Sequence, residues 1–201
     1  MIEVLAALSA SAAGGMRIAL PLLVIGLVSQ SGTGLWSQVP LLWRLHPQVV
    51  VAVLVSWTLC ELILAKSLVG QRVQQIVQLG FSPLAGAILG VTVAWHLGME
   101  PWPSAIVGGV GGSLALVIQL VQTGWFFRLR GLPWWVTIAE DLLSIGLVLL
   151  AFDAPQQGGL IALLLLWIAL RSSTAWRQWY VQQSVEGQPR ESPRQGKSAP
   201  D

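Results

Sequence analysis

The segment SAAGGMRIALPLL, residues 11–23, places an arginine and a proline inside an apolar run that is long enough to cross a membrane. A charged side chain at the middle of a bilayer costs about 2.5–3.5 kcal/mol on insertion scales, so Arg17 needs a carboxylate, backbone carbonyls or a water-filled cavity beside it. Gly14 and Gly15 let a helix break or let another backbone approach closely, and Pro21 removes the hydrogen bond to the carbonyl of residue 17. The segment therefore predicts a bent helix whose freed backbone groups face protein or water and not lipid.

The composition of the chain is typical of a membrane protein. Of its 201 residues, 54% are hydrophobic and only 10% are charged, and the mean hydropathy is +0.69, whereas soluble domains carry about 25% charged residues. The apolar residues form six runs without the alternation of a membrane barrel, at residues 2–28, 49–65, 83–97, 104–121, 134–152 and 159–170. We therefore predict an all-α, polytopic transmembrane bundle of about six helices, with one transmembrane domain at residues 1–171.

The basic residues predict how this bundle is oriented. With six crossings, the amino terminus, the second and fourth loops and the tail share one side, which carries Lys66, Arg72, Arg128, Arg130 and the basic residues from Arg171 onward. The other side carries only Arg44, and basic residues are retained in the cytoplasm during insertion. We therefore expect an integral membrane protein of a bacterial inner membrane, or of an organellar membrane of the thylakoid type, with both termini in the cytoplasm.

The carboxyl-terminal segment differs from the rest of the chain. Residues 172–185 predict a short interfacial helix that lies on anionic headgroups. Residues 186–201 are rich in proline, glycine and charge and cannot bury enough apolar surface to become ordered, which predicts a disordered cytoplasmic tail.

A weak internal similarity suggests a repeat. Pro83, Gly86 and Trp95 have the same spacing as Pro155, Gly158 and Trp167, and Gly111-Gly112 resembles Gly14-Gly15. Three helices in each half would give the two halves opposite orientations, as in the 3+3 inverted repeats of many transporters, where interrupted helices meet at a central site. Chance and simple helix packing explain the pattern about as well. On this interpretation Gly111 and Gly112 also mark an interrupted helix.

Three acidic residues lie inside the apolar runs. Glu61 is about one helical turn, and Glu140 and Asp141 about two turns, from the cytoplasmic boundary, whereas counting from Ile2 places Arg17 beyond the bilayer middle. Adjacent helical residues point about 100° apart, so Glu140 and Asp141 cannot both face one narrow cavity. Either these groups form buried pairs that fix helix register, or Arg17, Glu61, Glu140 and Asp141 line a path for a cation, proton or small anion.

Other kinds of site are not indicated by the sequence. No nucleophile–base set, metal-ligand spacing, haem pair or nucleic-acid patch occurs in it. We therefore expect no enzyme activity, no metal, no cofactor and no nucleic-acid partner. The lipid bilayer is the expected environment, and a homodimer and a second membrane protein both stay open as partners.

Four segments resemble, in the same order, a multi-pass membrane family catalogued as domain of unknown function 4126. They are SAAGGMRIALPLLVIGL, CELILAKSLVGQRV, FSPLAGAILG and IAEDLLSIGLVLLA, and the likeness spans about residues 5–150. The resemblance implies an integral membrane protein of about this length and carries no activity with it. It also implies an acidic stretch after Glu61, where this chain has AKS, and this difference counts against metal binding.

Two functions follow from these observations. The first is a small permease or channel-like protein for an ion or small polar solute, with Glu61 and Glu140 as cytoplasmic-side ligands or proton acceptors and Arg17 as a counter-ion. The second is a non-catalytic membrane scaffold or assembly factor. Lipid handling is a weaker third interpretation, suggested by the basic inner side.

Overall fold

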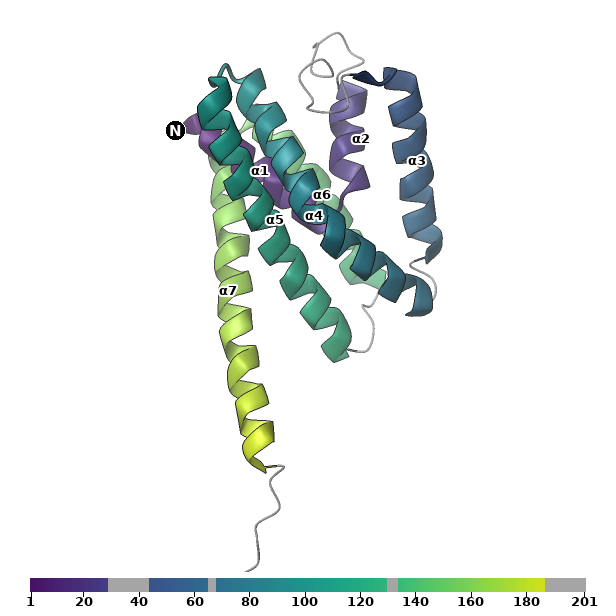
Figure 1. Cartoon of the computed structure of the whole chain (residues 1–201), viewed down its shortest axis with the longest axis vertical. Coiled ribbons are helices and arrows are strands. Elements are labelled where there is room, and N and C mark those ends of the chain that lie inside the picture. Colours follow the sequence, from purple (N-terminus) through teal and green to yellow (C-terminus); the bar gives the residue numbers. More distant parts are fainter. Residues whose placement is uncertain (29–43, 65–67, 130–133, 187–201) are drawn as a thin grey trace, which may run out of the picture.

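The computed structural model is all-α and describes residues 1–28, 44–64, 68–129 and 134–186. Within these residues the chain forms seven helices (Figure 1): α1 (Ile2–Met16), α2 (Ala19–Val28), α3 (Pro47–Leu64), α4 (Leu68–His96), α5 (Pro101–Leu129), α6 (Trp134–Asp153) and α7 (Pro155–Glu186). The number exceeds the expected six because the first apolar run folds into two helices, α1 and α2.

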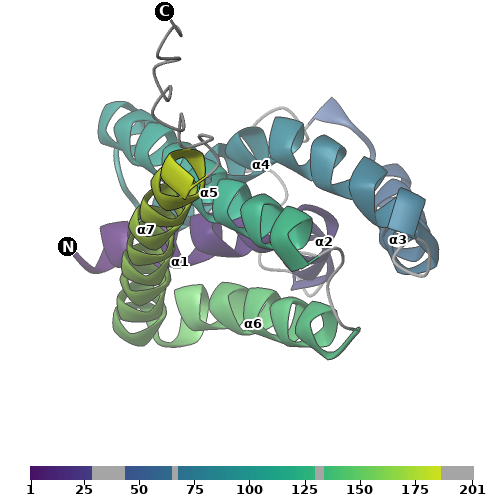
Figure 2. The same ribbon diagram turned by 90° about the horizontal axis from the view of Figure 1, so that it is seen from below.

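Helix α1 is the central element of the bundle. Seen along the bundle, it passes between α4 and α5 on one side and α6 on the other (Figure 2), and it also contacts α7. Every residue from Ser9 to Met16 is buried, and nearly all of them are Ala, Ser or Gly. Small side chains let helices approach closely, which is how helices associate in lipid, where burial of apolar side chains gives no driving force. The small-residue sequence of α1 therefore explains its central position.

Serine hydroxyls add polar contacts between α1 and its neighbours. The Ser9 hydroxyl donates to the carbonyl of Leu147 in α6 at 2.7 Å, and the Ser11 hydroxyl donates to the carbonyl of Gly86 in α4 at 2.8 Å. Both serines are fully buried. These bonds satisfy polar groups that would otherwise lie unpaired in an apolar interior.

Gly14 and Gly15 are contact points between helices. Helix α1 continues through both and ends at Met16. A Cβ atom on Gly14 would lie 3.1 Å from the backbone nitrogen of Gly86, and one on Gly15 would lie 2.6 Å from the Cα atom of Ala115. Of the two uses expected for these glycines, close backbone approach is therefore the one that the structure shows.

Gly111 and Gly112 serve the same purpose on α5. A Cβ atom on Gly111 would overlap the side chain of Ser11, and one on Gly112 would lie 2.7 Å from the carbonyl oxygen of Pro83. The interruption expected at Gly111 and Gly112 does not occur, since α5 is continuous from Pro101 to Leu129. Close packing, and not a break, accounts for this glycine pair.

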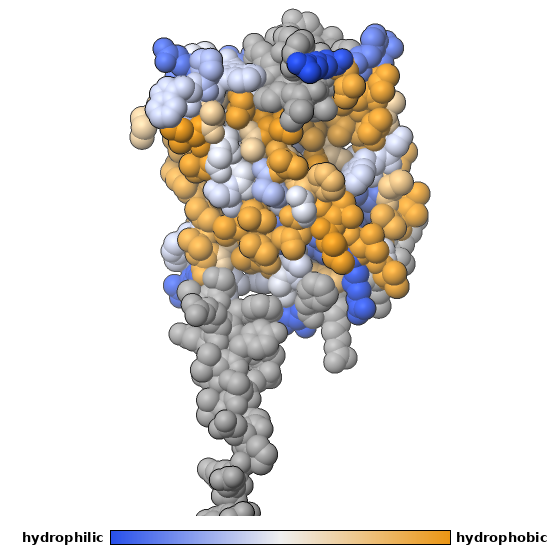
Figure 3. Space-filling view, viewed as in Figure 1, coloured by the Kyte–Doolittle hydropathy of each residue, from blue (hydrophilic) through white to orange (hydrophobic). Residues whose placement is uncertain are grey.

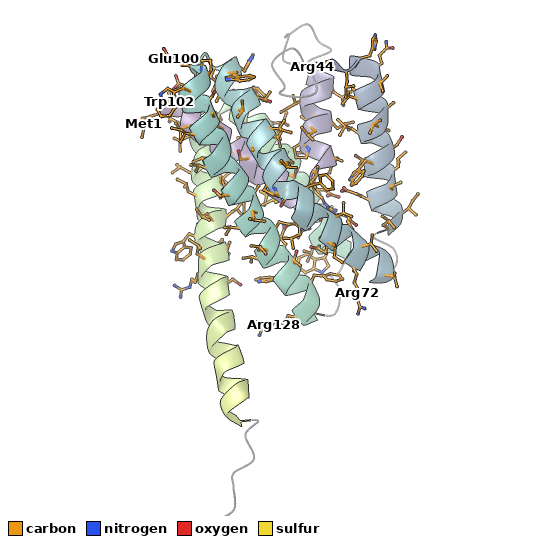
Figure 4. All side chains as sticks on the ribbon, in the orientation of Figure 1. Met1, Arg44, Arg72, Glu100, Trp102 and Arg128 are labelled. Atoms are coloured by element: carbon orange, nitrogen blue, oxygen red, sulfur yellow. The ribbon has the colours of Figure 1, made fainter. Side chains whose placement is uncertain are left out.

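The chain turns back where the first apolar run is interrupted. Helix α1 starts at the end of the bundle that holds Met1, and α2 returns toward the end that holds Arg44 (Figures 1 and 4). At about 1.5 Å per residue, the 15 residues of α1 and the 10 residues of α2 are shorter than a hydrocarbon core of about 30 Å. The term re-entrant pair is used below for α1, α2 and the residues between them.

The amino terminus and the end of α7 lie at opposite ends of the bundle. Met1, Arg44, Glu100 and Trp102 lie at one end of the bundle, and Arg72 and Arg128 lie at the other (Figure 4). Helix α7 runs toward the end of Arg72 and Arg128, opposite to the amino terminus (Figure 1). The expectation that both termini lie on one side of a membrane stays a prediction, although the amino terminus and the end of α7 lie at opposite ends of the bundle.

Pro21 lies in the first turn of α2 and is fully buried. The first four N–H groups of a helix have no acceptor within it, so a proline there removes no helical hydrogen bond. The expected loss of a bond to the carbonyl of residue 17 therefore does not arise. The interruption itself lies at Arg17 and Ile18, between the two helices.

Three of the described helical segments are long and apolar enough to cross a membrane: Val69–His96, Pro101–Phe126 and Trp135–Asp153. The side chains that face outward are largely apolar, and the face seen in Figure 3 shows a hydrophobic band between more polar ends. A bilayer is the environment in which such a surface is stable. These features indicate an integral membrane protein.

Two further expectations concern the second half of the chain. Residues 172–185 continue α7, which extends past the other helices toward Glu186 (Figure 1), so they do not form a separate helix. Contact of these residues with lipid headgroups stays a prediction. The tail after Glu186 lies outside the described residues. No inverted repeat is seen among the described helices, since Pro83 lies inside α4 whereas Pro155 begins α7.

Candidate functional site

Arg17 occupies the interruption between α1 and α2. Its backbone is extended (φ −139°, ψ 140°), and its N–H still donates to the carbonyl of Ala13 at 3.1 Å, which closes the last turn of α1. The side chain is only 7% exposed. A helix carboxyl terminus carries partial negative charge and favours a nearby cation. The end of α1 therefore contributes to holding the guanidinium inside the bundle.

Two acidic residues from other helices pair with Arg17. The Nε atom lies 2.6 Å from Oδ1 of Asp141 in α6, and Nη1 lies 3.9 Å from Oε2 of Glu61 in α3. The shorter contact, between Nε and Oδ1, is a close ion pair. Arg17, Glu61 and Asp141 are called the ion cluster below. It joins α1, α3 and α6 at the tip of the re-entrant pair.

Glu61 is held by neutral donors as well as by charge. Its Oε1 accepts hydrogen bonds from Nε1 of Trp57 at 2.9 Å and from Nε2 of Gln78 at 3.3 Å. The residue is 7% exposed. Because these donors compensate part of the cost of burial, the Glu61 carboxylate has a defined position even though its contact with Arg17 is long.

A row of glutamines on α4 extends the ion cluster. Gln71, Gln74, Gln75 and Gln78 recur at the spacing of one helical face, and the last three are buried. Nε2 of Gln119 in α5 donates to Oε1 of Gln75 at 3.1 Å, and the Thr123 hydroxyl donates to the same oxygen at 3.0 Å. This row was not among the residues predicted from the sequence, although polar residues at i, i+3, i+4 and i+7 inside an apolar helix are a readable signal.

A small polar cavity lies beside the ion cluster. It is lined by Arg17, by Gln71, Gln74 and Gln75 of α4, and by Phe126, Thr137 and Glu140. Measured over the positions that the centre of a water molecule can occupy, its volume is about 20 Å³, enough for one water. The lining comes from the start of α4, the end of α5 and the start of α6. The cavity therefore lies toward the end of the bundle that holds Arg72 and Arg128.

The predicted path residues are thus brought together in part. Arg17, Glu61 and Asp141 meet directly, whereas Glu140 borders the cavity and makes no hydrogen bond or ion pair with any residue that the structure describes. Asp141, and not Glu140, points at Arg17, which agrees with the expectation that the two adjacent acids face different surroundings. Of the glycines and proline named as helix breaks, Gly14, Gly15 and Pro21 lie within two to four residues of Arg17, and Gly111 and Gly112 are contacts between helices.

The fold and the ion cluster define a class: an all-α protein with candidate membrane spans, built around a re-entrant helix pair whose tip carries a buried arginine. The chain belongs to the family described as domain of unknown function DUF4126, whose model matches residues 4–175. This match confirms the resemblance drawn from the sequence. No curated protein and no solved structure matches the chain. Within the described residues, no group of three or more His, Cys, Asp or Glu side chains is arranged to hold a metal ion.

Proposed function

We propose that the protein is a small membrane permease and that the ion cluster lies on the path of an ion or small polar solute. The observation that carries the proposal is the convergence of Arg17, Glu61 and Asp141 beside a polar cavity inside an apolar bundle. Ionisable groups within membrane helices mark transport or proton paths more often than they mark structure alone.

The balance of charge favours a cation or a proton over an anion. One guanidinium faces the carboxylates of Glu61 and Asp141, and Glu140 adds a third acid at the cavity wall. With all of these groups ionised, the site carries an excess of negative charge. Amide oxygens of the glutamine row are further ligands for a partly dehydrated cation.

The proposed orientation follows the basic residues. Arg72 and Arg128 mark the end of the bundle toward which the cavity lies, and basic ends stay in the cytoplasm. On this basis the site faces the cytoplasm and the amino terminus lies on the opposite side. The path beyond Arg17 is closed by the tightly packed small residues of α1, so the proposal is an alternating-access carrier rather than an open pore.

Flux measurements in proteoliposomes test this proposal. Glu61→Gln and Glu140→Gln are expected to abolish flux across a panel of protons, monovalent cations and small anions, with the protein still folded. Glu100→Gln, an exposed residue at the other end of the bundle, is the matched control and should keep flux near the wild-type level. Wild-type flux in both Glu61→Gln and Glu140→Gln, or no flux in the wild-type protein for any ion of the panel, would overturn the transport role.

A membrane scaffold is the alternative, and one observation favours it. Ala105, Gly109 and Ser113 form an exposed stripe of small residues on α5, at a spacing that suits contact with another membrane helix. Purification in a mild detergent separates the two functions. A stoichiometric partner protein without measurable flux favours the scaffold, and a uniform homo-oligomer with flux favours the permease.

A further inference from the structure

A second cavity lies beside the polar one and differs from it in character. It is bounded by α5, α6 and α7 and by Met16 at the end of α1. Its volume, measured over the positions that the centre of a water molecule can occupy, is about 220 Å³. Its walls are aliphatic except for Gln122, Trp125 and Glu140. Helices α5 and α6 both pack on α7 and hardly touch each other, which leaves this space between them. It is called the apolar groove below.

Glu140 is the residue that connects the two cavities. It lines both the polar cavity and the apolar groove. Its neighbour Asp141 is engaged by Arg17, whereas Glu140 makes no ion pair or hydrogen bond with the residues that the structure describes. The positive charge of Arg17 acts on Glu140 without direct contact and is already paired with Asp141 and Glu61. A carboxylate that faces an apolar space and shares its counter-charge in this way is costly to bury, so its natural complement is a cation that brings its own apolar surface.

Trp125 supplies a second feature that suits a cation. Its indole N–H donates to the hydroxyl of Ser172 in α7 at 2.8 Å, which fixes the ring at the wall of the groove. The face of an indole ring attracts cations, more strongly where water is excluded. A lipid acyl chain would fill the groove equally well but would bring no positive charge to Glu140.

We infer that the apolar groove binds a lipophilic monocation, with its hydrophobic body between α5 and α7 and its positive charge at the Glu140 carboxylate. The inference rests on the proposed function in one respect: it names the class of substrate that would pass from the apolar groove, past Glu140, into the polar cavity. Binding itself does not depend on transport. The shape of the groove selects for apolar groups and its one carboxylate selects for charge sign.

Two probes of equal size and opposite charge test the inference. Tetraphenylphosphonium should bind the purified full-length protein in dodecyl maltoside, measured by isothermal titration calorimetry, and tetraphenylborate should bind at least about tenfold more weakly. Glu140→Gln should weaken tetraphenylphosphonium binding about tenfold or more, and Glu140→Asp should weaken it less. Equal affinity for the two probes would show an unselective hydrophobic groove that a lipid chain fills, and would overturn the inference.

A groove-filling variant separates a local effect from misfolding. Val121→Trp, on the groove wall, should lower tetraphenylphosphonium affinity without any change of charge. Leu149→Trp, an exposed residue of α6 outside the groove, should leave it unchanged. Unchanged affinity in both Glu140→Gln and Val121→Trp, or no binding to the wild-type protein, would refute the site.

The two proposals fail in different ways. Small-ion flux that depends on Glu61, with no binding of tetraphenylphosphonium, would overturn the inference and leave the permease standing. Charge-selective binding that depends on Glu140, with no flux of any ion or of tetraphenylphosphonium, would overturn the permease and leave a binding site.

Discussion

Asp141→Asn tests how the buried guanidinium is held. The substitution keeps the shape of the side chain and removes its charge. At an effective dielectric constant of about 20, unit charges at the 2.6 Å separation of Arg17 and Asp141 attract by about 6 kcal/mol, and those at the 3.9 Å separation of Arg17 and Glu61 by about 4 kcal/mol. Asp141 therefore supplies the larger share of the attraction that offsets the burial of Arg17.

The expected cost is smaller than this attraction. Removing one partner of a buried pair typically lowers the free energy of unfolding by about 3–5 kcal/mol. We expect about 3 kcal/mol for Asp141→Asn, because the Asp141 side chain is 22% exposed and Glu61 still faces Arg17. Glu61→Gln should cost less, about 1–2 kcal/mol, since the glutamine oxygen can still accept hydrogen bonds from Trp57 and Gln78.

Equilibrium unfolding in mixed micelles, followed by tryptophan fluorescence, measures these differences. Asp153→Asn, an exposed residue at the far end of the same helix, is the matched control and should have no measurable effect. The double variant Arg17→Met with Asp141→Leu should recover much of the loss, because no unpaired guanidinium remains. A double variant as unstable as Asp141→Asn, or an Asp141→Asn protein as stable as the wild type, would show that water and not the ion pair compensates Arg17.

Three further predictions concern the packing, the topology and the motion of the helices. Gly15→Ala should lower the free energy of unfolding by about 1–3 kcal/mol, because its Cβ would lie 2.6 Å from the Cα of Ala115. Gly146→Ala is the control and should leave the free energy of unfolding unchanged, since its Cβ would have no atom within 4 Å. Equal effects of the two substitutions would refute the packing argument. In a Cys60→Ser background, cysteines at Glu3 and Glu100 should react with an impermeant maleimide from one side of the membrane and a cysteine at Arg128 from the other; labelling of Glu3 and Arg128 from the same side would disprove the re-entrant pair. A bifunctional thiol reagent that joins native Cys60 to a cysteine at Val77 should stop flux, whereas flux that persists in the cross-linked protein would exclude separation of α3 from α4 as a transport step.

Much of the environment of Arg17 could be predicted from the segment at residues 11–23. An arginine in an apolar run requires a partner, and Asp141 is that partner. A break in the helix provides backbone groups beside the arginine, and the helix is interrupted between α1 and α2. Its depth was not predictable. Counting from Ile2 assumes a straight helix across the bilayer, whereas α1 is tilted and ends at Met16, so that Arg17 meets acids expected in the other half of the bundle (Figures 1 and 2).

The choice between Glu140 and Asp141 shows a second limit of sequence reasoning. The two acids are adjacent, and only the rotation of α6 about its axis decides which one faces Arg17. That rotation is fixed by contacts such as the bond from Ser9 to the carbonyl of Leu147, which joins residues 138 positions apart. No local pattern contains this information. The glutamine row on α4 is different, because its helical spacing was visible in the sequence.

The packing of the helices indicates where the bundle can open. Among the described helices, α3 packs mainly on α2 and, less closely, on α4, whereas α4, α5, α6 and α7 all pack on α1. Arg17 is held more closely by the helices that pack on α1 than by α3. It lies 2.6 Å from Asp141 of α6 but 3.9 Å from Glu61 of α3. The contact across the looser interface is therefore the weaker one, and a third cavity, of about 160 Å³ and lined by Cys60, Glu61 and Val77 among others, lies along it. If α2 and α3 move as a pair, Glu61 leaves Arg17 while Asp141 stays, and the interruption at Arg17 and Ile18 is where the chain would bend.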